Sequence, residues 1–230
     1  LNDKTHNIKY YSVKDGIQLS SFTNSDNLGA SAVASMAAGY TTGTAGIAST
    51  VVGSYSGVMN TGTSSAILGH DVRGAAAVSV GTVNVNNNTD TSKTFSGVAN
   101  SIVGQANMTT DSNAAIIVGA GNSVTNSYRE LDKDALSAIK SAGSVSALKD
   151  ALQAAVPKSG AQVMVMGGGN NVESAYMSQV VGVGNTVTGA DSTYAEGTST
   201  QYNFVDGFQN ELTNGKNDYI IGSNNSVTGD

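Results

Sequence analysis

The sequence predicts an all-β solenoid, a stack of two-stranded coils joined by parallel strands, with one short helical insertion. Two observations predict it. One phrase recurs along the chain: two apolar residues, a glycine, four mostly small polar residues and a further apolar residue. Successive copies mostly place their glycines about 15 residues apart, as at Gly104 and Gly119 or Gly207 and Gly222. A short fixed period indicates stacked, near-identical units rather than one globular core.

The glycine that follows the apolar pair is the anchor of each copy. The predicted anchors are Gly39, Gly53, Gly69, Gly81, Gly104, Gly119, Gly167, Gly182, Gly197, Gly207 and Gly222. In the regular copies an aliphatic residue follows five positions later, at Val58, Val124, Val172, Val187, Leu212 and Val227. We expect both apolar positions to face the interior, for example at Ile117 and Val181. Val72 and Met108 come slightly early, so the first half of the chain is less regular.

The period decides between two kinds of solenoid. Helical-pair repeats need about 33–47 residues, whereas two strands of about five residues with two tight turns fit about 15. Val, Ile and Thr favour strands, and Gly, Asn, Asp and Ser favour turns. A single proline in 230 residues leaves almost every backbone donor free for a continuous ladder. A three-sided hexapeptide helix needs about 18 residues per coil, so the two-sided coil is favoured.

At these residues the chain resembles the head domain of trimeric autotransporter adhesins. The matching copies are SIVGQAN (101–107), IIVGAGNSVTN (116–126), VVGVGNTVTG (180–189) and IIGSNNSVTG (220–229). Residues 28–50 resemble the start of such heads, and KYYSVKD (9–15) resembles the short strand that precedes them. The resemblance implies a left-handed parallel β-roll and a homotrimer. It also implies a bacterial outer-membrane anchor in a part outside this sequence, and adhesion to host cells, neighbouring cells or matrix.

The residues favour a trimer independently of the resemblance. A coil of two short strands encloses little volume, so a single chain would leave apolar side chains on one flank. Oligomerisation is a common remedy for a small core, and cyclic symmetry keeps the association closed. We expect four segments: an entry segment (1–27), a first part of the roll (28–127), a helical insertion (128–160) and a second part of the roll (161–230).

Two stretches break the period. Residues 128–160 are rich in Ala, Leu, Lys and Asp, and their apolar residues recur at helical spacing. They predict two helices, 131–142 and 145–155, with Ser144 as an N-cap and Pro157 as the stop. The Asn- and Thr-rich stretch 83–100 predicts an exposed loop, with Phe95 as its only large apolar side chain. Either stretch is a structural element or a binding projection, because insertions on a repetitive scaffold lie on its surface.

Composition excludes several function classes. The net charge of −6, without a basic stripe, argues against nucleic-acid binding. No apolar run approaches the ~20 residues of a membrane helix. With no cysteine, disulfides and thiolate metal sites are excluded. No signal peptide is visible, and we expect a fragment of a longer protein.

No constellation of catalytic residues stands out. His70 beside Asp71 lacks a second partner at a defined spacing, and no GxSxG elbow occurs. The run 166–175 departs from the calcium-binding nonapeptide pattern. Threonines at 109–112 and 198–200 suggest a flat array for ice binding, but they do not recur with the period. We therefore predict no enzyme activity, no catalytic residue, no cofactor and no metal.

The prediction is a bacterial surface adhesin head that attaches in a multivalent way to a host receptor, matrix or a partner bacterial surface. Two alternatives remain, a hexapeptide-repeat acyltransferase and a ligand-free stalk segment. The candidate receptor contacts are charged residues of the helical insertion together with aromatic residues of two loops. They are Arg129, Glu130, Asp132, Lys133, Lys140, Lys149, Phe95, Tyr202, Phe204 and Phe208.

Overall fold

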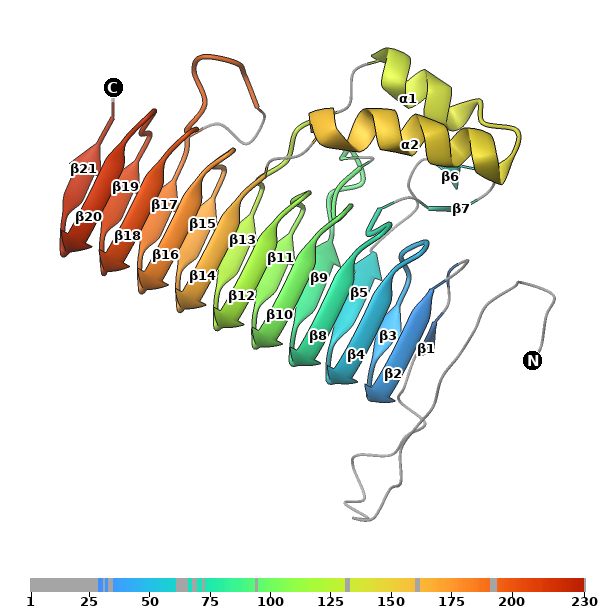
Figure 1. Cartoon of the computed structure of the whole chain (residues 1–230), viewed down its shortest axis with the longest axis horizontal. Coiled ribbons are helices and arrows are strands. Elements are labelled where there is room, and N and C mark those ends of the chain that lie inside the picture. Colours follow the sequence, from blue (N-terminus) through green and yellow to red (C-terminus); the bar gives the residue numbers. More distant parts are fainter. Residues whose placement is uncertain are drawn as a thin grey trace.

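The computed structural model describes residues 29–30, 32, 35–60, 66–67, 70–71, 73–93, 95–130, 133–159, 162–190 and 194–229. Within them the chain forms two long sheets of parallel strands that run side by side along the molecule (Figure 1). Each coil gives one strand to each sheet, so the solenoid has two strand-bearing sides rather than three. The predicted β-solenoid is confirmed. The predicted entry segment, 1–27, lies outside the described residues.

The two sheets differ in strand length and in number. The nine-stranded sheet contains, in spatial order, β2 (Met36–Tyr40), β4 (Thr50–Ser54), β8 (Val78–Thr82), β10 (Ser101–Gln105), β12 (Ile116–Ala120), β14 (Met164–Gly168), β16 (Gln179–Val183), β18 (Phe204–Phe208) and β20 (Tyr219–Ser223). The ten-stranded sheet contains β1 (Gly29–Ala30), β3 (Gly43–Thr44), β5 (Gly57–Asn60), β9 (Val85–Asn88), β11 (Met108–Thr110), β13 (Ser123–Thr125), β15 (Asn171–Glu173), β17 (Thr186–Thr188), β19 (Glu211–Thr213) and β21 (Ser226–Thr228).

The anchor glycines form one row across the nine-stranded sheet. Pairing aligns Gly39, Gly53, Gly81, Gly104, Gly119, Gly167, Gly182, Gly207 and Gly222. Their φ angles lie between +115° and +141°, and a Cβ on any of the first eight would lie 1.6–2.0 Å from the next glycine's carbonyl oxygen. Glycine is therefore required at each rung by the backbone conformation, and at the first eight also by the close approach of the next coil.

One predicted anchor, Gly197, does not belong to this row. Strand β16 pairs directly with β18, so no rung is left between them, and Gly197 occupies a turn with φ +82°. This prediction was wrong because a parallel stack pairs whole coils and passes over residues inserted between them. Gly69, another predicted anchor, lies outside the described residues. Spacing alone cannot distinguish a rung from a glycine in an insertion.

Most strands send one side chain into the space between the sheets, and β9 buries two, Asn86 and Asn88. In the nine-stranded sheet it is the second residue of the strand, for example Ile117 and Val180, both fully buried. In the ten-stranded sheet it is the residue five positions after the anchor, as predicted for Val172 and Leu212. Val181 was predicted to face inward and does not. It pairs with Met166 on the outer face. Because the outer face is also apolar, the sequence does not show which of two adjacent apolar residues faces inward.

A second ladder is made of asparagines, which the sequence indicated only as turn residues. It runs three positions after the anchors and contains Asn84, Asn107, Asn122, Asn170, Asn185, Asn210 and Asn225. The side-chain Oδ1 of every member except the last accepts hydrogen bonds of 2.8–3.1 Å from the backbone N–H and the Nδ2 of the next member. All but Asn225, in the last coil, are buried. The ladder satisfies the polar groups that a two-residue turn would otherwise leave buried without partners.

The two edges of the solenoid are unlike. Every turn from the nine-stranded to the ten-stranded sheet has two residues, and in most coils the second is a ladder asparagine. All four long excursions lie at the opposite edge, after β5, β9, β13 and β17, at 61–77, 89–100, 126–163 and 189–203. Figure 1 shows the helices and the orange loop that follows β17 projecting on the same side. We call this side the insertion edge.

The largest excursion carries two helices, α1 (Lys133–Lys140) and α2 (Val145–Ser159). The Ser144 hydroxyl accepts a hydrogen bond of 3.2 Å from the N–H of Ala147, which is the predicted N-cap. Helix α2 continues through Pro157 to Ser159, although a stop was predicted there. The proline removes only its own N–H, and the carbonyl that loses this partner belongs to the exposed residue Gln153. None of the described helices combines the length and apolar character needed to cross a membrane.

The stretch 83–100 is not one exposed loop. Its residues 85–88 form β9, which pairs in register with β5 and β11. Asn86 occupies a core position, where its Oδ1 accepts hydrogen bonds from Thr109 Oγ1 (2.8 Å) and Asn100 Nδ2 (3.1 Å). Polar residues thus replace aliphatic ones inside these coils, which explains the irregular first half of the pattern.

Candidate functional site

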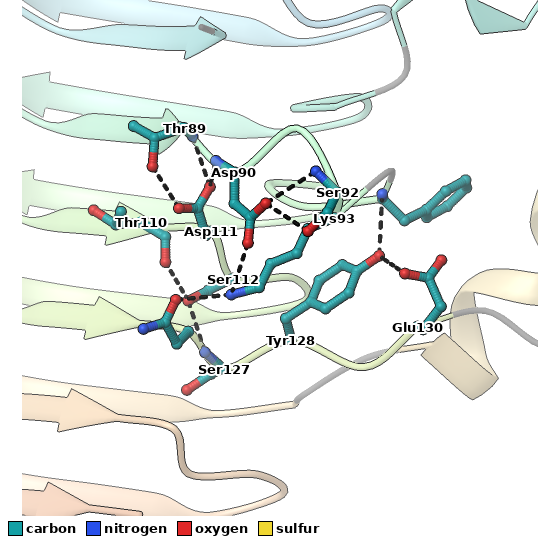
Figure 2. A network of polar contacts seen from close by, with 12 residues as sticks. Thr89, Asp90, Ser92, Lys93, Thr110, Asp111, Ser112, Ser127, Tyr128 and Glu130 are labelled. Carbon is teal, nitrogen blue, oxygen red and sulfur yellow. Dashed lines mark hydrogen bonds and ion pairs between the residues drawn. The ribbon is translucent and has the colours of Figure 1, made fainter. Parts of the chain in front are cut away.

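The insertion edge is organised by a polar network at its centre (Figure 2). The carboxylate of Asp111, which is almost fully buried, accepts hydrogen bonds from the N–H groups of Thr89 (2.7 Å) and Asp90 (3.0 Å) and from the Thr89 hydroxyl (2.5 Å). Hydrogen bonds from the hydroxyl and the N–H of Ser92 lower the pKa of Asp90. These contacts hold the loop after β9 in one conformation against the neighbouring coil.

Lys93 connects this loop to the chain that leads into the helices. Its Nζ donates a hydrogen bond of 2.8 Å to Asn126 Oδ1 and lies 5.7 Å from the centre of the Tyr128 ring. The Tyr128 hydroxyl donates to Glu130 Oε2 (2.6 Å) and accepts from the N–H of Phe95 (3.3 Å). Two excursions that are separate in the sequence therefore form one structure at the insertion edge.

Phe95 was predicted as a receptor contact, and its burial contradicts this. Its side chain is fully buried in a cluster with Val98, Tyr128 and the helix residues Ile139 and Ala155. The only large apolar side chain of the stretch is thus the point where the helices pack on the roll. Sequence reasoning missed this because the helices that cover Phe95 come from a later excursion.

A cationic and aromatic cluster joins the third and fourth excursions. The Arg129 guanidinium lies over the Tyr194 ring, 4.7 Å from its centre. The Tyr194 ring in turn meets the buried Tyr176 edge to face, with 5.1 Å between centres. Burial, followed by the neighbouring Tyr202, raises the pKa of Tyr194, while Arg129 acts in the opposite direction. We call Arg129, Tyr194 and Tyr202 the Arg129 cluster.

The structure brings together only two of the predicted contact residues, Arg129 and Tyr202. Tyr194, which links them, was not among the predicted contacts, and the only sequence signal for it was the concentration of aromatic residues late in the chain. Glu130 is held by Tyr128, and Lys149 lies exposed on α2.

The remaining predicted contacts fall elsewhere. Lys133 and Lys140 belong to α1, with side chains outside the described part, and Asp132 is not among the described residues. Phe204 and Phe208 lie on β18, where Phe204 packs on Tyr219 with 6.2 Å between ring centres. The late aromatic group therefore divides between the sheet and the insertion edge.

The outer face of the nine-stranded sheet carries an apolar strip with one interruption. Pairing aligns one residue from each strand, namely Ala38, Val52, Val80, Val103, Val118, Met166, Val181, Asp206 and Ile221. Asp206 is the only polar member. Val52, Val80, Val103, Val118 and Met166 are 36–42% exposed, Val181 is partly buried, and Ile221 in the last coil is 72% exposed. We call this row the apolar strip.

The outer face of the ten-stranded sheet is mostly polar instead, with the exposed Met59 and Met108 as apolar exceptions. Thr110, Thr125, Thr188, Thr213 and Thr228 share one row, with Glu173 between the second and the third. The expectation that threonines do not recur with the period is therefore wrong for this row. The insertions after β13 and β17 hide the recurrence in the sequence. Glu173 interrupts the row and Glu211 lies in the row beside it, so the face is not a uniform threonine array.

Comparison with known proteins gives no assignment: no protein-family model matches the chain, no curated protein does, and no solved structure does. The candidate sites therefore stand on their own geometry. Among the described residues no group of three or more His, Asp or Glu side chains could hold a metal ion.

Proposed function

We propose that the protein is the head of a homotrimeric bacterial surface adhesin, a left-handed β-roll that presents its insertion edge to a receptor, to matrix or to a partner cell. The observation that carries the proposal is the apolar strip. Nine strands about 4.8 Å apart make it about 40 Å long. Exposed apolar patches of this extent mark association surfaces. The opposite sheet offers mostly Thr, Ser, Asn and Glu, which suit contact with water, and has only Met59 and Met108 as exposed large apolar side chains among its described residues.

A closed trimer accounts for this distribution. If three copies associate side by side with their apolar strips around a common axis, each covers the strips of the other two. The polar sheet and the insertion edge then stay accessible on all three copies. Three equal sites let weak individual contacts add to strong attachment. The resemblance of the repeats to adhesin heads supports the same arrangement and display at the cell surface.

The association is tested by charge on the apolar strip. The double variant Val103→Asp/Val118→Asp is expected to be a folded monomer, because assembly would bury six carboxylates near the axis at several kcal/mol each. Light scattering should change from three times 23.1 kDa to 23.1 kDa. The matched control, Thr110→Asp/Thr125→Asp, changes the same two coils on the other sheet and should remain trimeric. A wild-type chain that is monomeric at micromolar concentration would remove the proposal.

Attachment is tested on the helical insertion. We expect replacement of residues 132–160 by a short Gly-Ser turn to leave a trimer that no longer binds cells or matrix-coated surfaces. The segment 126–130 is retained, because Asn126 and Tyr128 hold the loop after β9. Since the deletion uncovers Phe95, a second variant, Lys149→Glu, probes the exposed face of α2 with the cover in place. Undiminished attachment in both folded variants would show that the helices are not the contact surface and would favour the structural alternative for them.

A further inference from the structure

The Arg129 guanidinium has the properties of an anion-binding group held ready for use. Its Cζ lies 4.7 Å from the centre of the Tyr194 ring, and its backbone is tied by a hydrogen bond of 3.3 Å from Asn113 Nδ2 to the Arg129 carbonyl. No residue of the described segments accepts a hydrogen bond or forms an ion pair with its side chain. The side chain is only partly buried, so its N–H donors can reach a ligand. Arginine stacked in this way binds carboxylates through two parallel hydrogen bonds.

The support beneath the guanidinium is rigid. Tyr194 rests on Tyr176, which is fully buried between the roll and the excursion. The loop that follows is closed by hydrogen bonds from the N–H of Ala195 to Ser199 Oγ (2.8 Å) and from Lys216 Nζ to the Gly197 carbonyl (2.9 Å). A site that is ordered before binding loses less entropy when the ligand arrives.

The neighbourhood adds a flat aromatic surface and a second cation. Tyr202 is 49% exposed, and its N–H donates to the Tyr176 carbonyl (3.2 Å), which fixes its backbone beside the same ring pair. Lys216 is the only basic residue between 164 and 229. It lies in the turn between β19 and β20, and its Nζ reaches the loop at the Gly197 carbonyl. An exposed phenol ring can stack on the C–H face of a sugar ring, and its hydroxyl can hydrogen-bond with sugar hydroxyls. The exposed carboxylate of Glu196 can accept from sugar hydroxyls as well.

We propose that the Arg129 cluster binds acidic saccharides: Arg129 holds the carboxylate of a uronic or similar sugar acid, and Tyr202 stacks on a sugar ring. This names the ligand class of the proposed adhesin and rests on that function only for its biological setting. An acidic peptide could also meet Arg129, but it would leave the exposed face of Tyr202 without a matching ring.

The test titrates the whole chain with oligogalacturonate, which carries carboxylates only. Neutral malto-oligosaccharide of equal length, a heparin oligosaccharide and poly-glutamate serve as comparison probes. We expect oligogalacturonate to bind, with affinity that falls as salt rises, and malto-oligosaccharide not to bind. Because the protein contains no tryptophan, Tyr202→Trp provides a fluorescence signal specific to this site.

Variants separate the roles of the cluster. Arg129→Gln and Tyr202→Ala should each weaken oligogalacturonate binding at least tenfold, and Arg129→Lys should weaken it less than Arg129→Gln. The control, Glu211→Gln on the exposed outer face of the ten-stranded sheet, should stay within twofold of wild type. Thermal melting of each variant shows whether the fold is intact. If Arg129→Gln lowers the melting temperature, the binding affinities of Arg129→Lys and Tyr202→Ala test the site instead.

Several results would overturn the proposal: no binding of oligogalacturonate at millimolar concentration, equal binding by folded Arg129→Gln, or binding of poly-glutamate alone. Preference for heparin with the same loss in Arg129→Gln would keep the site and assign it to sulfated sugars. If cells attach but oligogalacturonate does not bind, the saccharide site is wrong and the proposed adhesion stands. If oligogalacturonate binds but cells do not attach, the saccharide site stands and the proposed adhesion is wrong.

Discussion

Gly167→Ala is expected to disrupt the solenoid, whereas Gly168→Ala, one residue later in the same strand, is expected to leave stability almost unchanged. A Cβ on Gly167 would lie 1.9 Å from the carbonyl oxygen of Gly182, at a φ of +124°. The nearest atom to a Cβ on Gly168 is the carbonyl oxygen of Ala120 at 3.6 Å, which is ordinary contact. The backbone conformation alone costs about 1–3 kcal/mol for a non-glycine residue, and separating the two coils adds to it.

Thermal unfolding followed by circular dichroism compares the two variants directly. Gly168→Ala serves as the control for changed strand composition, since both variants add one methyl group to β14. Gly167→Ala should lose about 3 kcal/mol or more, or fail to fold. Equal melting temperatures would mean that the coils do not approach as closely as the glycine row indicates.

Asn170→Ala is expected to destabilise the protein strongly, while Asn171→Ala is expected to have little effect. The Asn170 side chain donates to Asn122 Oδ1 (2.9 Å) and to the Gly182 carbonyl (2.9 Å). Its Oδ1 accepts from the N–H and the Nδ2 of Asn185, both at 3.0 Å. Alanine would leave several buried groups with fewer partners, at about 1–3 kcal/mol each. The expected loss is roughly 3 kcal/mol or more.

Asn171 gives a matched control because its side chain points out of β15 and is exposed. Chemical denaturation of both variants yields the two free energies of unfolding. Hydrogen exchange adds a local measure. The backbone N–H of Asn185 donates to Asn170 Oδ1, so it should exchange faster in Asn170→Ala. If the asparagine ladder does not stabilise the fold, the two variants will have equal free energies of unfolding and the Asn185 N–H will exchange at its wild-type rate.

Much of the fold could be predicted because its signals are local. The glycine of each copy is required by the backbone of its own rung, and the aliphatic residue five positions later follows from the length of a two-residue turn between two strands. The helices of the insertion could also be predicted, since their apolar spacing and the Ser144 cap lie within the segment itself. Pro157 misled the prediction because one missing N–H does not end a helix when the carbonyl left without this partner belongs to an exposed residue, here Gln153.

Less of the candidate site could be predicted from the sequence. The Asn-rich stretch before β10 was interpreted as a loop because asparagine is rare in strands, yet Asn86 lies in the core with its polar groups paired. Phe95 was interpreted as exposed because its cover comes from a later excursion. Arg129 and Tyr202 were both named, but nothing in their spacing showed that Tyr194 would bring them together.

The sequence by itself determined the period, the two-sided coil and the places where the period breaks, because these depend on residues within one coil. The tertiary structure alone decided which of Val180 and Val181 faces the core, that the asparagines form a buried ladder, and that all long excursions share one edge. The physical reason is that a parallel stack joins each coil to the next by register, whatever length of chain lies between them. Contacts between excursions, such as that of Arg129 with Tyr194, therefore follow the order of the coils and leave no periodic trace in the sequence.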